Sequence, residues 1–277
     1  MPRFFVTKEM IQDGSATITG SDAYHIGRSL RMAVGDDIYI SDGEGKEFLA
    51  KLTKIRDDEC IAEIISESAS SEPDMSITLY MAYPKGDKLE MVIQKAVELG
   101  ATRIVPFESS RCIKRPKADK VAKQGERLSK IAEEAAKQCG RCIVPEVALP
   151  LSYSAMLKDA ASAELKLICY EKESDLSIKR LLSDNTPRSI AIIVGCEGGF
   201  SPEEVEEAVA AGCHSVTLGK RILRCETVPS AVLLNMSSGP MMPSGNPGKF
   251  STSVVVVSWP PIWLPVKTSG CKSARAA

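Results

Sequence analysis

Two arginines and a glutamate lie close together in the C-terminal half of the chain, directly after an apolar segment. Arg221 and Arg224 are three residues apart, and Glu226 follows two residues later. The apolar residues between the arginines, Ile222 and Leu223, predict a partly buried loop, where an arginine needs an anionic or aromatic partner. The other interpretation is that both arginines are solvated and that Glu226 complements the dipole of a following helix. A cationic pair beside a carboxylate could stabilise a developing anion and accept a proton.

Glycines gather at a second point, where an apolar segment meets the start of a helix. Residues 189–194 are predicted to be a buried strand, and three of the next five residues are glycine. Ser201 then stands at the N-cap position, Pro202 at N1 and Glu204 at N3, which predicts a capping box. Glycines before such a cap let a ligand approach the backbone, whose amides can receive an anion or the polar edge of a heterocycle. A plain strand-to-helix turn has the same spacing, so this motif alone is a weak signal.

Composition excludes several classes of protein. The 277 residues carry 35 Lys+Arg and 36 Asp+Glu, and the net charge of −1 gives no overall basic field that would attract nucleic acid. With 44% apolar and 26% charged residues, the chain is predicted to be globular. No apolar run approaches the ~18 residues of a membrane span, and residues 1–8 lack the apolar core of a secretory signal. Nine scattered cysteines indicate reduced thiols, so we expect a cytoplasmic protein without a membrane partner.

Residues 1–72 have the pattern of a small all-β unit. Alternating segments at hairpin spacing predict strands within 36–43, 48–55 and 60–65. One helical segment is expected at 21–32, with Ser21 or Asp22 as its N-cap. The polar segment 66–73 ends at a proline and is predicted to be a linker. Together these features predict a small barrel or sandwich.

Residues 73–238 change to alternating strands and helices. Apolar, β-prone segments predict strands at 77–83, 103–107, 165–170, 189–194 and 215–218. Helices are predicted at 88–99, 119–138, 176–182, 202–211 and 228–236. Buried strands separated by helices are typical of a parallel sheet covered on both faces. Residues 239–277 form an atypical tail, rich in Pro, Gly and Ser and then apolar, which resembles neither unit.

Ordered short motifs along residues 1–236 resemble the SPOUT class of RNA methyltransferases, most closely the bacterial family that methylates N3 of a uracil in small-subunit (16S) ribosomal RNA. Besides the two loops above, the motifs are residues 2–6, His25, 28–31, 34–36, 42–43, 85–88, 94–100, Arg111 and 134–141. The resemblance implies an N-terminal PUA-like RNA-binding β-barrel and a C-terminal parallel-sheet methyltransferase domain with a deep trefoil knot. It also implies a homodimer, S-adenosyl-L-methionine as cofactor, and 16S rRNA or the assembled small ribosomal subunit as partner.

The resemblance also assigns residues to a site. The cofactor-binding residues it implies are Cys169, Tyr170, Gly195, Glu197, Gly198, Gly199, Leu218, Gly219, Ile222, Leu223 and Arg224. Against this cofactor we predict Arg221, Arg224 and Glu226 as catalytic residues, the arginines stabilising an anionic uracil and the glutamate accepting its N3 proton. Cys196 stands where the family usually has proline, which would fix φ near −65°, so a looser cofactor loop is expected. The tail from about residue 239 is a second departure, because the family normally ends there with a helix.

Positive charge concentrates in residues 111–130, where eight basic side chains face two acidic ones. This is the pattern of an RNA-contacting edge, although a solvated helix face would have it too. The predicted RNA-binding residues are Arg28, Arg31, Arg111, Lys114, Arg115, Lys117 and Arg141. Cys139 and Cys142 have the spacing of a zinc-ligand pair, but no second pair lies at finger spacing, so no metal is predicted. His25 and His214 are not expected to be catalytic bases.

Two alternatives stay open at this point. A ribose 2′-O-methyltransferase of the same superfamily would explain both loops equally well, though not the N-terminal unit. A catalytically inactive RNA-binding protein is the other alternative, since Cys196 and the tail could each impair an enzyme.

Overall fold

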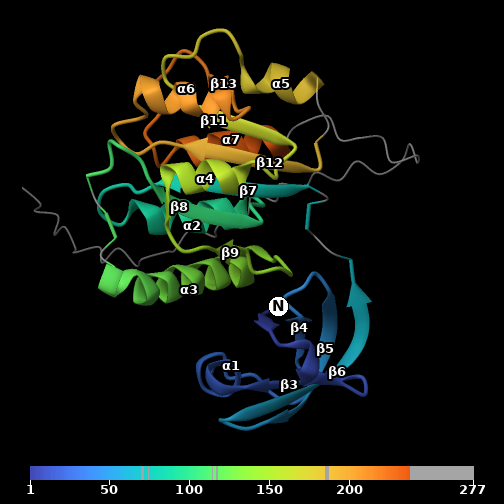
Figure 1. The fold of residues 1–277 in the computed structure, drawn as a ribbon. Coiled ribbons are helices and arrows are strands. Elements are labelled where there is room, and N and C mark those ends of the chain that lie inside the picture. The colour runs from blue at the N-terminus through green and yellow to red at the C-terminus, as the bar shows by residue number, and fades with distance from the viewer. Residues whose placement is uncertain (70–71, 74, 114, 117, 185–186, 238–277) are drawn as a thin grey trace, which may run out of the picture. The chain divides into compact units, whose positions relative to one another are not determined.

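A computed structural model of the chain shows the fold (Figure 1). It describes residues 1–69, 72–73, 75–113, 115–116, 118–184 and 187–237. The atypical tail at 239–277 and two of the predicted RNA-binding residues, Lys114 and Lys117, lie outside the described residues.

The N-terminal part of the chain forms a curled six-stranded sheet with the order β1-β4-β5-β6-β3-β2. Its strands are β1 (Arg3–Phe5), β2 (Ile11–Gln12), β3 (Ser15–Thr19), β4 (Asp37–Ser41), β5 (Glu47–Ile55) and β6 (Glu59–Ser68). β1 pairs in parallel with β4, and the other neighbours are antiparallel. Alternate side chains point to one face, as Ala16 and Ile18 do in β3, and pack in a core with Ile26, Ile38 and Leu52. The all-β prediction for this part of the chain is confirmed.

The helix in this part is shorter than predicted and starts earlier. It consists of α1 (Gly20–Tyr24) and a π-helical turn, η2 (His25–Ser29). Thr19 occupies the N-cap position, so the expectation of Ser21 or Asp22 is wrong. The reason is that β3 continues up to Thr19, which makes the helix begin at the next residue. A 3-10 turn, η1 (Lys8–Met10), precedes β2.

The expected linker at 66–73 also begins later than predicted, because β6 extends into it. Ser66, Glu67 and Ser68 pair with residues of β5 across the sheet. Ladder hydrogen bonds use only backbone groups, so polar side chains on a partly exposed strand do not end it.

Seven strands form a second, entirely parallel sheet with the order β10-β8-β7-β12-β11-β13, and β9 pairs with β8. They are β7 (Ser76–Ala82), β8 (Arg103–Glu108), β9 (Glu146–Val147), β10 (Leu151–Ser152), β11 (Leu165–Cys169), β12 (Ser189–Val194) and β13 (His214–Val216). All residues of β12 from Ile190 to Val194 are buried, which requires cover on both faces of the sheet. The predicted parallel sheet is confirmed.

Helices connect these strands. They are α2 (Lys88–Glu98), the turn η3 (Ala118–Lys120), α3 (Val121–Cys139), α4 (Tyr153–Ala160), α5 (Ile178–Asp184), α6 (Pro202–Ala210) and α7 (Val228–Ser237). α2 buries its predicted apolar face, including Leu89, Ile93 and Val97, and contacts α3 and α7. Among the described residues, no helix has both the length and the apolar character that crossing a membrane requires.

The strand register aligns the carboxyl ends of four neighbouring strands. Cys169 of β11 pairs with both Val194 of β12 and Val216 of β13, and Val194 pairs with Met81 of β7. Because parallel strands leave the sheet at the same edge, the segments that follow these strands meet there. The fold therefore brings the glycine-rich and the arginine-bearing segments to one edge of the sheet. The trefoil knot implied by the resemblance stays a prediction.

Candidate active site

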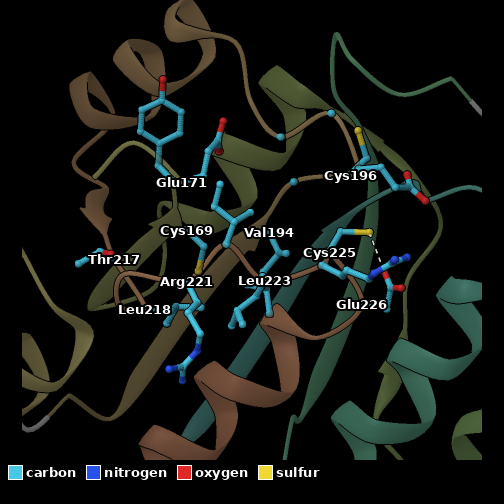
Figure 2. A pocket seen from close by; sticks show the side chains of 18 of the residues that line it. Cys169, Glu171, Val194, Cys196, Thr217, Leu218, Arg221, Leu223, Cys225 and Glu226 are labelled. Atoms are coloured by element: carbon cyan, nitrogen blue, oxygen red, sulfur yellow. Dashed lines mark hydrogen bonds between the residues drawn. The ribbon is translucent and has the colours of Figure 1, made fainter. Parts of the chain in front are cut away.

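A cavity of about 450 Å³ lies at this carboxyl edge of the parallel sheet (Figure 2). Its volume is within the range of roughly 300–1,000 Å³ that is usual for small-molecule sites. Two segments supply most of its wall, residues 195–199, which we call the glycine loop, and residues 217–226, which we call the arginine loop. All the predicted cofactor-binding and catalytic residues line this one cavity.

The glycine loop folds back tightly on itself. The N–H of Gly199 donates to the carbonyl of Cys196 over 2.9 Å, and Gly199 has a φ of +64°. A Cβ on Gly195 would lie 3.1 Å from the carbonyl carbon of Gly199, and a Cβ on Gly199 would lie 2.9 Å from Oε2 of Glu171. Position 195 therefore requires glycine because the backbone of Gly199 approaches it closely, and position 199 requires glycine because of its positive φ.

α6 begins directly after the glycine loop with the predicted capping box. Oγ of Ser201 accepts from the N–H of Glu204 over 3.2 Å, and the N–H of Ser201 donates to Oε2 of Glu204 over 3.0 Å. The other carboxylate oxygen, Oε1, accepts from the N–H of Ser110 over 2.7 Å. This glutamate thus ties the start of α6 to the segment that follows β8.

The arginine loop is more exposed than its sequence suggested. Arg221 and Arg224 are both exposed, and Ile222 is 84% exposed, while Cys225 is buried. The expectation of a partly buried loop is therefore wrong for Ile222, although Leu223 is half-buried as expected and lies on the cavity wall in Figure 2. The reason is that an irregular segment has no period that would turn both apolar side chains toward the core.

A network of charged groups connects the two loops. Nζ of Lys88 lies 2.9 Å from Oε1 of Glu197 in the glycine loop and 3.3 Å from Oε2 of Glu226 in the arginine loop. Glu197 also accepts from the backbone N–H of Lys85 over 3.0 Å. The thiol of Cys225, shown beside Glu226 in Figure 2, donates to Oε2 of that carboxylate over 3.2 Å.

These contacts favour the charged form of all three groups. The pKa of Glu226 is lowered first by a hydrogen bond from its own backbone N–H, and further by Cys225 and Lys88. Burial acts against ionisation of Glu197, but hydrogen bonds from Lys88 and from its own backbone outweigh burial and lower its pKa. The pKa of Lys88 is raised, mainly by its hydrogen bond to Glu197. Both carboxylates are consequently ionised at neutral pH.

Sequence reasoning missed three charged residues of the cavity wall, Lys88, Glu171 and Lys220. A signal for Lys88 existed, because it stands at the strand-to-helix junction within the motif 85–88 that contributed to the resemblance. Glu171 directly follows Cys169 and Tyr170, which were predicted, and its position at the end of β11 was the available signal.

Cys196 is buried against the segment that follows β8. Its Sγ lies 3.9 Å from Oγ of Ser109, which in turn lies 3.3 Å from Sγ of Cys112. A hydrogen bond from the Cys112 thiol lowers the pKa of Cys196, and the same bond raises the pKa of Cys112. The looser loop expected from cysteine at this position stays a prediction.

The predicted RNA-binding residues occupy different environments. Arg28, Arg31 and Arg115 are exposed and accessible to a large partner. Nη1 of Arg111 donates to the carbonyl of Gly198 over 2.8 Å, so this arginine lies against the glycine loop.

Arg141 is only 6% exposed, an environment that does not favour its predicted contact with RNA. Its Nη1 donates to the carbonyls of Val97 (3.1 Å) and Ala101 (2.5 Å), and its Nη2 lies 2.6 Å from Oε2 of Glu72. Gly140 ends α3 in the left-handed region, at a φ of +87°, and the chain turns inward there. Arg141 is therefore held in a buried pair with Glu72, and its contact with RNA stays a prediction.

No group of three or more His, Cys, Asp or Glu side chains gathers as metal ligands in the part of the chain that the structure describes. Cys139 is exposed, whereas Cys142 is buried, where its thiol donates to the carbonyl of Gly45 over 3.4 Å. His25 and His214 are both exposed and outside the cavity wall.

Comparison with known proteins gives the class to which this fold and site belong. Residues 71–237 match the RNA methyltransferase domain family, and residues 18–65 match the RNA methyltransferase PUA domain. The crystal structure of a ribosomal RNA small subunit methyltransferase E from Neisseria gonorrhoeae bound to S-adenosyl methionine is similar, with a TM-score of 0.77 and 33% identity, covering 86% of this chain and 97% of that one. The fold and the site are those of an RNA methyltransferase.

Relatives of similar length narrow the class to one family. The chain is 34% identical over 247 residues to Ribosomal RNA small subunit methyltransferase E of Bacillus subtilis, covering 86% of this chain and 96% of that protein. It is 33% identical over 239 residues to the protein of the same name from Synechocystis, and the match covers 85% of this chain and 77% of that protein. The chain belongs to the ribosomal RNA small subunit methyltransferase E family, which confirms the resemblance inferred from its motifs.

Proposed function

We propose that this chain transfers a methyl group from S-adenosyl-L-methionine to N3 of a specific uracil in small-subunit ribosomal RNA. The observation that carries the proposal is the meeting of the glycine loop and the arginine loop at one cavity on the carboxyl edge of a parallel sheet. The names of the relatives from Bacillus subtilis and Synechocystis support ribosomal RNA of the small subunit as the substrate. The relative solved with S-adenosyl methionine supports the cofactor.

The cavity wall fits a bulky cofactor with a cationic centre. Gly195 and Gly199 leave backbone where a Cβ would intrude, apolar side chains such as Val194 and Leu223 can cover a flat heterocycle, and carboxylates such as Glu171 attract positive charge. The residues proposed to hold the cofactor are Cys169, Tyr170, Gly195, Glu197, Gly198, Gly199, Leu218, Gly219, Ile222, Leu223 and Arg224. When bound, S-adenosyl-L-methionine supplies an activated methyl group that carries its own leaving group.

The arginine loop is proposed to activate N3 of the uracil. Uracil N3 is a poor nucleophile until it loses its proton, and the negative charge that develops is shared with O2 and O4. We assign Arg221 and Arg224 to those oxygens, where a positioned cation stabilises the developing anion. We assign Glu226 to the N3 proton, because it is a half-buried carboxylate on the cavity wall. Its lowered pKa keeps it in the ionised form that a base needs, while limiting its driving force for proton transfer.

RNA recognition is proposed to combine the PUA-like part with the basic segment at 111–130. The match of residues 18–65 to an RNA methyltransferase PUA domain supports this assignment. The residues proposed to contact phosphates are Arg28, Arg31, Arg111, Lys114, Arg115 and Lys117. Because the whole chain is nearly neutral, a local patch must supply the attraction.

We further propose that the chain is a cytoplasmic homodimer that acts on 16S rRNA or on the assembled small subunit. We propose that each chain consists of two domains, at residues 1–72 and 73–238. Two exposed apolar side chains, Ile222 in the arginine loop and Leu234 in α7, support an interface beside the cavity. Sedimentation equilibrium tests the oligomeric state, and a monomer at working concentration would exclude the dimer.

Two measurements test the proposed function. Calorimetry with S-adenosyl-L-methionine separates a methyltransferase from an inactive RNA-binding protein. Mass analysis of nucleosides, on small subunits that lack the modification and are then incubated with protein and cofactor, is expected to show 3-methyluridine. The appearance of a 2′-O-methylated nucleoside instead would favour the ribose methyltransferase.

A further inference from the structure

Lys88 stands at a position that its own helix does not favour. It is the first residue of α2, directly after the N-cap residue Asp87. The N-terminus of a helix carries partial positive charge, so an ammonium there is less favourable than an acidic side chain. The side chain is 30% exposed and lines the cavity. The contacts of the Lys88 side chain, and not the stability of α2, therefore account for a lysine at this position.

Those contacts are carboxylates from two separate loops. Nζ of Lys88 lies 2.9 Å from Glu197 and 3.3 Å from Glu226. One ammonium, supplied by the helix that follows β7, thus bridges the loop after β12 and the loop after β13. Two carboxylates this close to a common point repel each other unless a cation lies between them.

We propose that Lys88 is a positioning residue for methyl transfer, which bridges Glu197 and Glu226, fixes the glycine loop against the arginine loop and holds the Glu226 carboxylate at the cavity. The inference rests on the proposed function, in which Glu226 accepts the proton of uracil N3. Lys88 is assigned no contact with the base, and it acts through the two carboxylates.

Four titratable groups meet at this bridge, Lys88 from α2, Glu197 from the glycine loop, and Cys225 and Glu226 from the arginine loop. Burial, with a hydrogen bond to Glu226, raises the pKa of Cys225 to about 12, so its thiol stays neutral at working pH. Without the ammonium, Glu226 keeps its backbone and thiol hydrogen bonds but faces Glu197 with no cation between them. Its pKa must then rise, and the fraction in the ionised form falls on the acidic side.

The test compares three variants of the full-length protein. Lys88→Met keeps the length of the side chain and removes the charge, and Lys88→Arg keeps the charge. Lys95→Met is the matched control, since Lys95 lies on the same helix and pairs instead with Glu98, at 2.8 Å. We expect Lys88→Met to move the acidic limb of the pH–rate profile upward by about one pH unit, which lowers kcat roughly tenfold at a pH on that limb. We expect Lys88→Arg to restore most of the rate, and Lys95→Met to match the wild type.

A second readout needs neither activity nor cofactor. Carbon NMR titration of glutamate side chains in the cofactor-free protein, with Glu226→Gln and Glu197→Gln to identify the signals, follows both carboxylates directly. The titration midpoint of Glu226 is expected to rise in Lys88→Met and to stay unchanged in Lys95→Met. An unchanged midpoint in Lys88→Met, or a pH–rate profile that superimposes on that of the wild type, overturns the proposal. If the midpoint moves while the wild type transfers no methyl group, the bridge stands and the proposed function fails.

Discussion

The guanidinium of Arg111 donates a 2.8 Å hydrogen bond to the carbonyl of Gly198. A Cβ on Gly198 would lie 3.0 Å from the Cβ of Arg111, so the two residues are also in close packing contact. One belongs to the basic segment proposed to meet RNA, and the other to the loop proposed to hold the cofactor. Binding of RNA at Arg111 and binding of cofactor at the glycine loop should therefore affect each other, and by the same factor in both directions.

Arg111→Ala is expected to weaken cofactor binding about threefold to tenfold, because a charge-assisted hydrogen bond that holds the glycine loop is lost. Calorimetry with S-adenosyl-L-methionine measures the change. Arg115→Ala is the control, since Arg115 is exposed and lies 3.9 Å from Glu108, away from the cavity. Equal cofactor affinities in the two variants would show that the contact with Gly198 does not support the loop.

Gly199→Ala should strain the backbone and displace the flexible Glu171 carboxylate, whose Oε2 would otherwise lie 2.9 Å from the new Cβ. Gly14→Ala is a matched control, because Gly14 has a similar φ of +74° and open space around its Cβ position. The control isolates the backbone cost, of order 1 kcal/mol. We expect Gly199→Ala to lower the melting temperature about as much as the control. Because Glu171 lines the cavity, we also expect Gly199→Ala to weaken cofactor binding at least tenfold, which the control should not do. Cofactor binding as tight as in the control would contradict the geometry of the loop.

Arg141→Ala should destabilise the fold by about 3–5 kcal/mol, because it leaves the Glu72 carboxylate without its buried cation. Urea unfolding measures the loss. Arg28→Ala serves as the exposed counterpart, since its pair with Asp57 lies in solvent, and no change in stability is expected. A stable Arg141→Ala protein with weakened RNA binding would instead restore the original assignment of Arg141 to RNA.

Arg224→Ala is expected to lower turnover about 100-fold or more, and Glu226→Gln by about 100-fold at most. Because the folded pKa of Glu226 is lowered, the wild-type rate should fall only as the pH drops through that lowered value, and Glu226→Gln should lack this limb. Methyl transfer followed from below pH 4.5, the ordinary pKa of a glutamate, up to about pH 9, with cofactor affinity as the control for folding, measures both. If Glu226→Gln works at the wild-type rate throughout, Glu226 is structural and the proton leaves by another route.

Replacing Lys114, Arg115 and Lys117 together by alanine should weaken RNA binding without changing cofactor affinity. The slope of log K against log salt concentration should flatten by ~0.7–0.9 for each phosphate contact that is lost. Binding assays at several salt concentrations measure this slope. An unaltered slope would mean that these three charges are merely solvated.

Local sequence patterns were sufficient to predict features that depend only on residues close together in the chain. The capping box of Ser201 and Glu204 was predicted from four consecutive positions, because N-cap hydrogen bonds join residues three apart. The apolar face of α2 followed from its 3.6-residue period, and the strand at Ser189–Val194 followed from the unbroken apolar run at 190–194. The family resemblance added the residues of the cavity wall, since motifs assigned to a shared site carry information that spacing alone does not.

The same local reasoning failed where contacts with distant segments of the chain determine the burial or the secondary structure of a residue. In the sequence, Arg141 resembles any basic residue after a helix. In the structure, α3 ends at Gly140, and the Arg141 side chain forms a buried ion pair with Glu72, 69 residues away in the sequence. Ile222 looks like a core residue, yet its loop has no regular period and leaves it in solvent. The polar residues 66–68 have the composition of a linker, but in the structure they pair with the backbone of β5 and belong to β6.

The sequence by itself determined the class of fold, the position of the glycine and arginine loops and the family, because periodicity, capping and ordered motifs are local properties of the chain. Only the tertiary structure decided that Lys88 lies between Glu197 and Glu226, because strand pairing in the order β7-β12-β11-β13 makes these strands end at one edge of the sheet. Strand order and register depend on long-range backbone hydrogen bonds, which no short pattern of residues encodes. For the same reason the ionised state of Glu226, which depends partly on a lysine 138 residues earlier in the chain, became visible only in the folded protein.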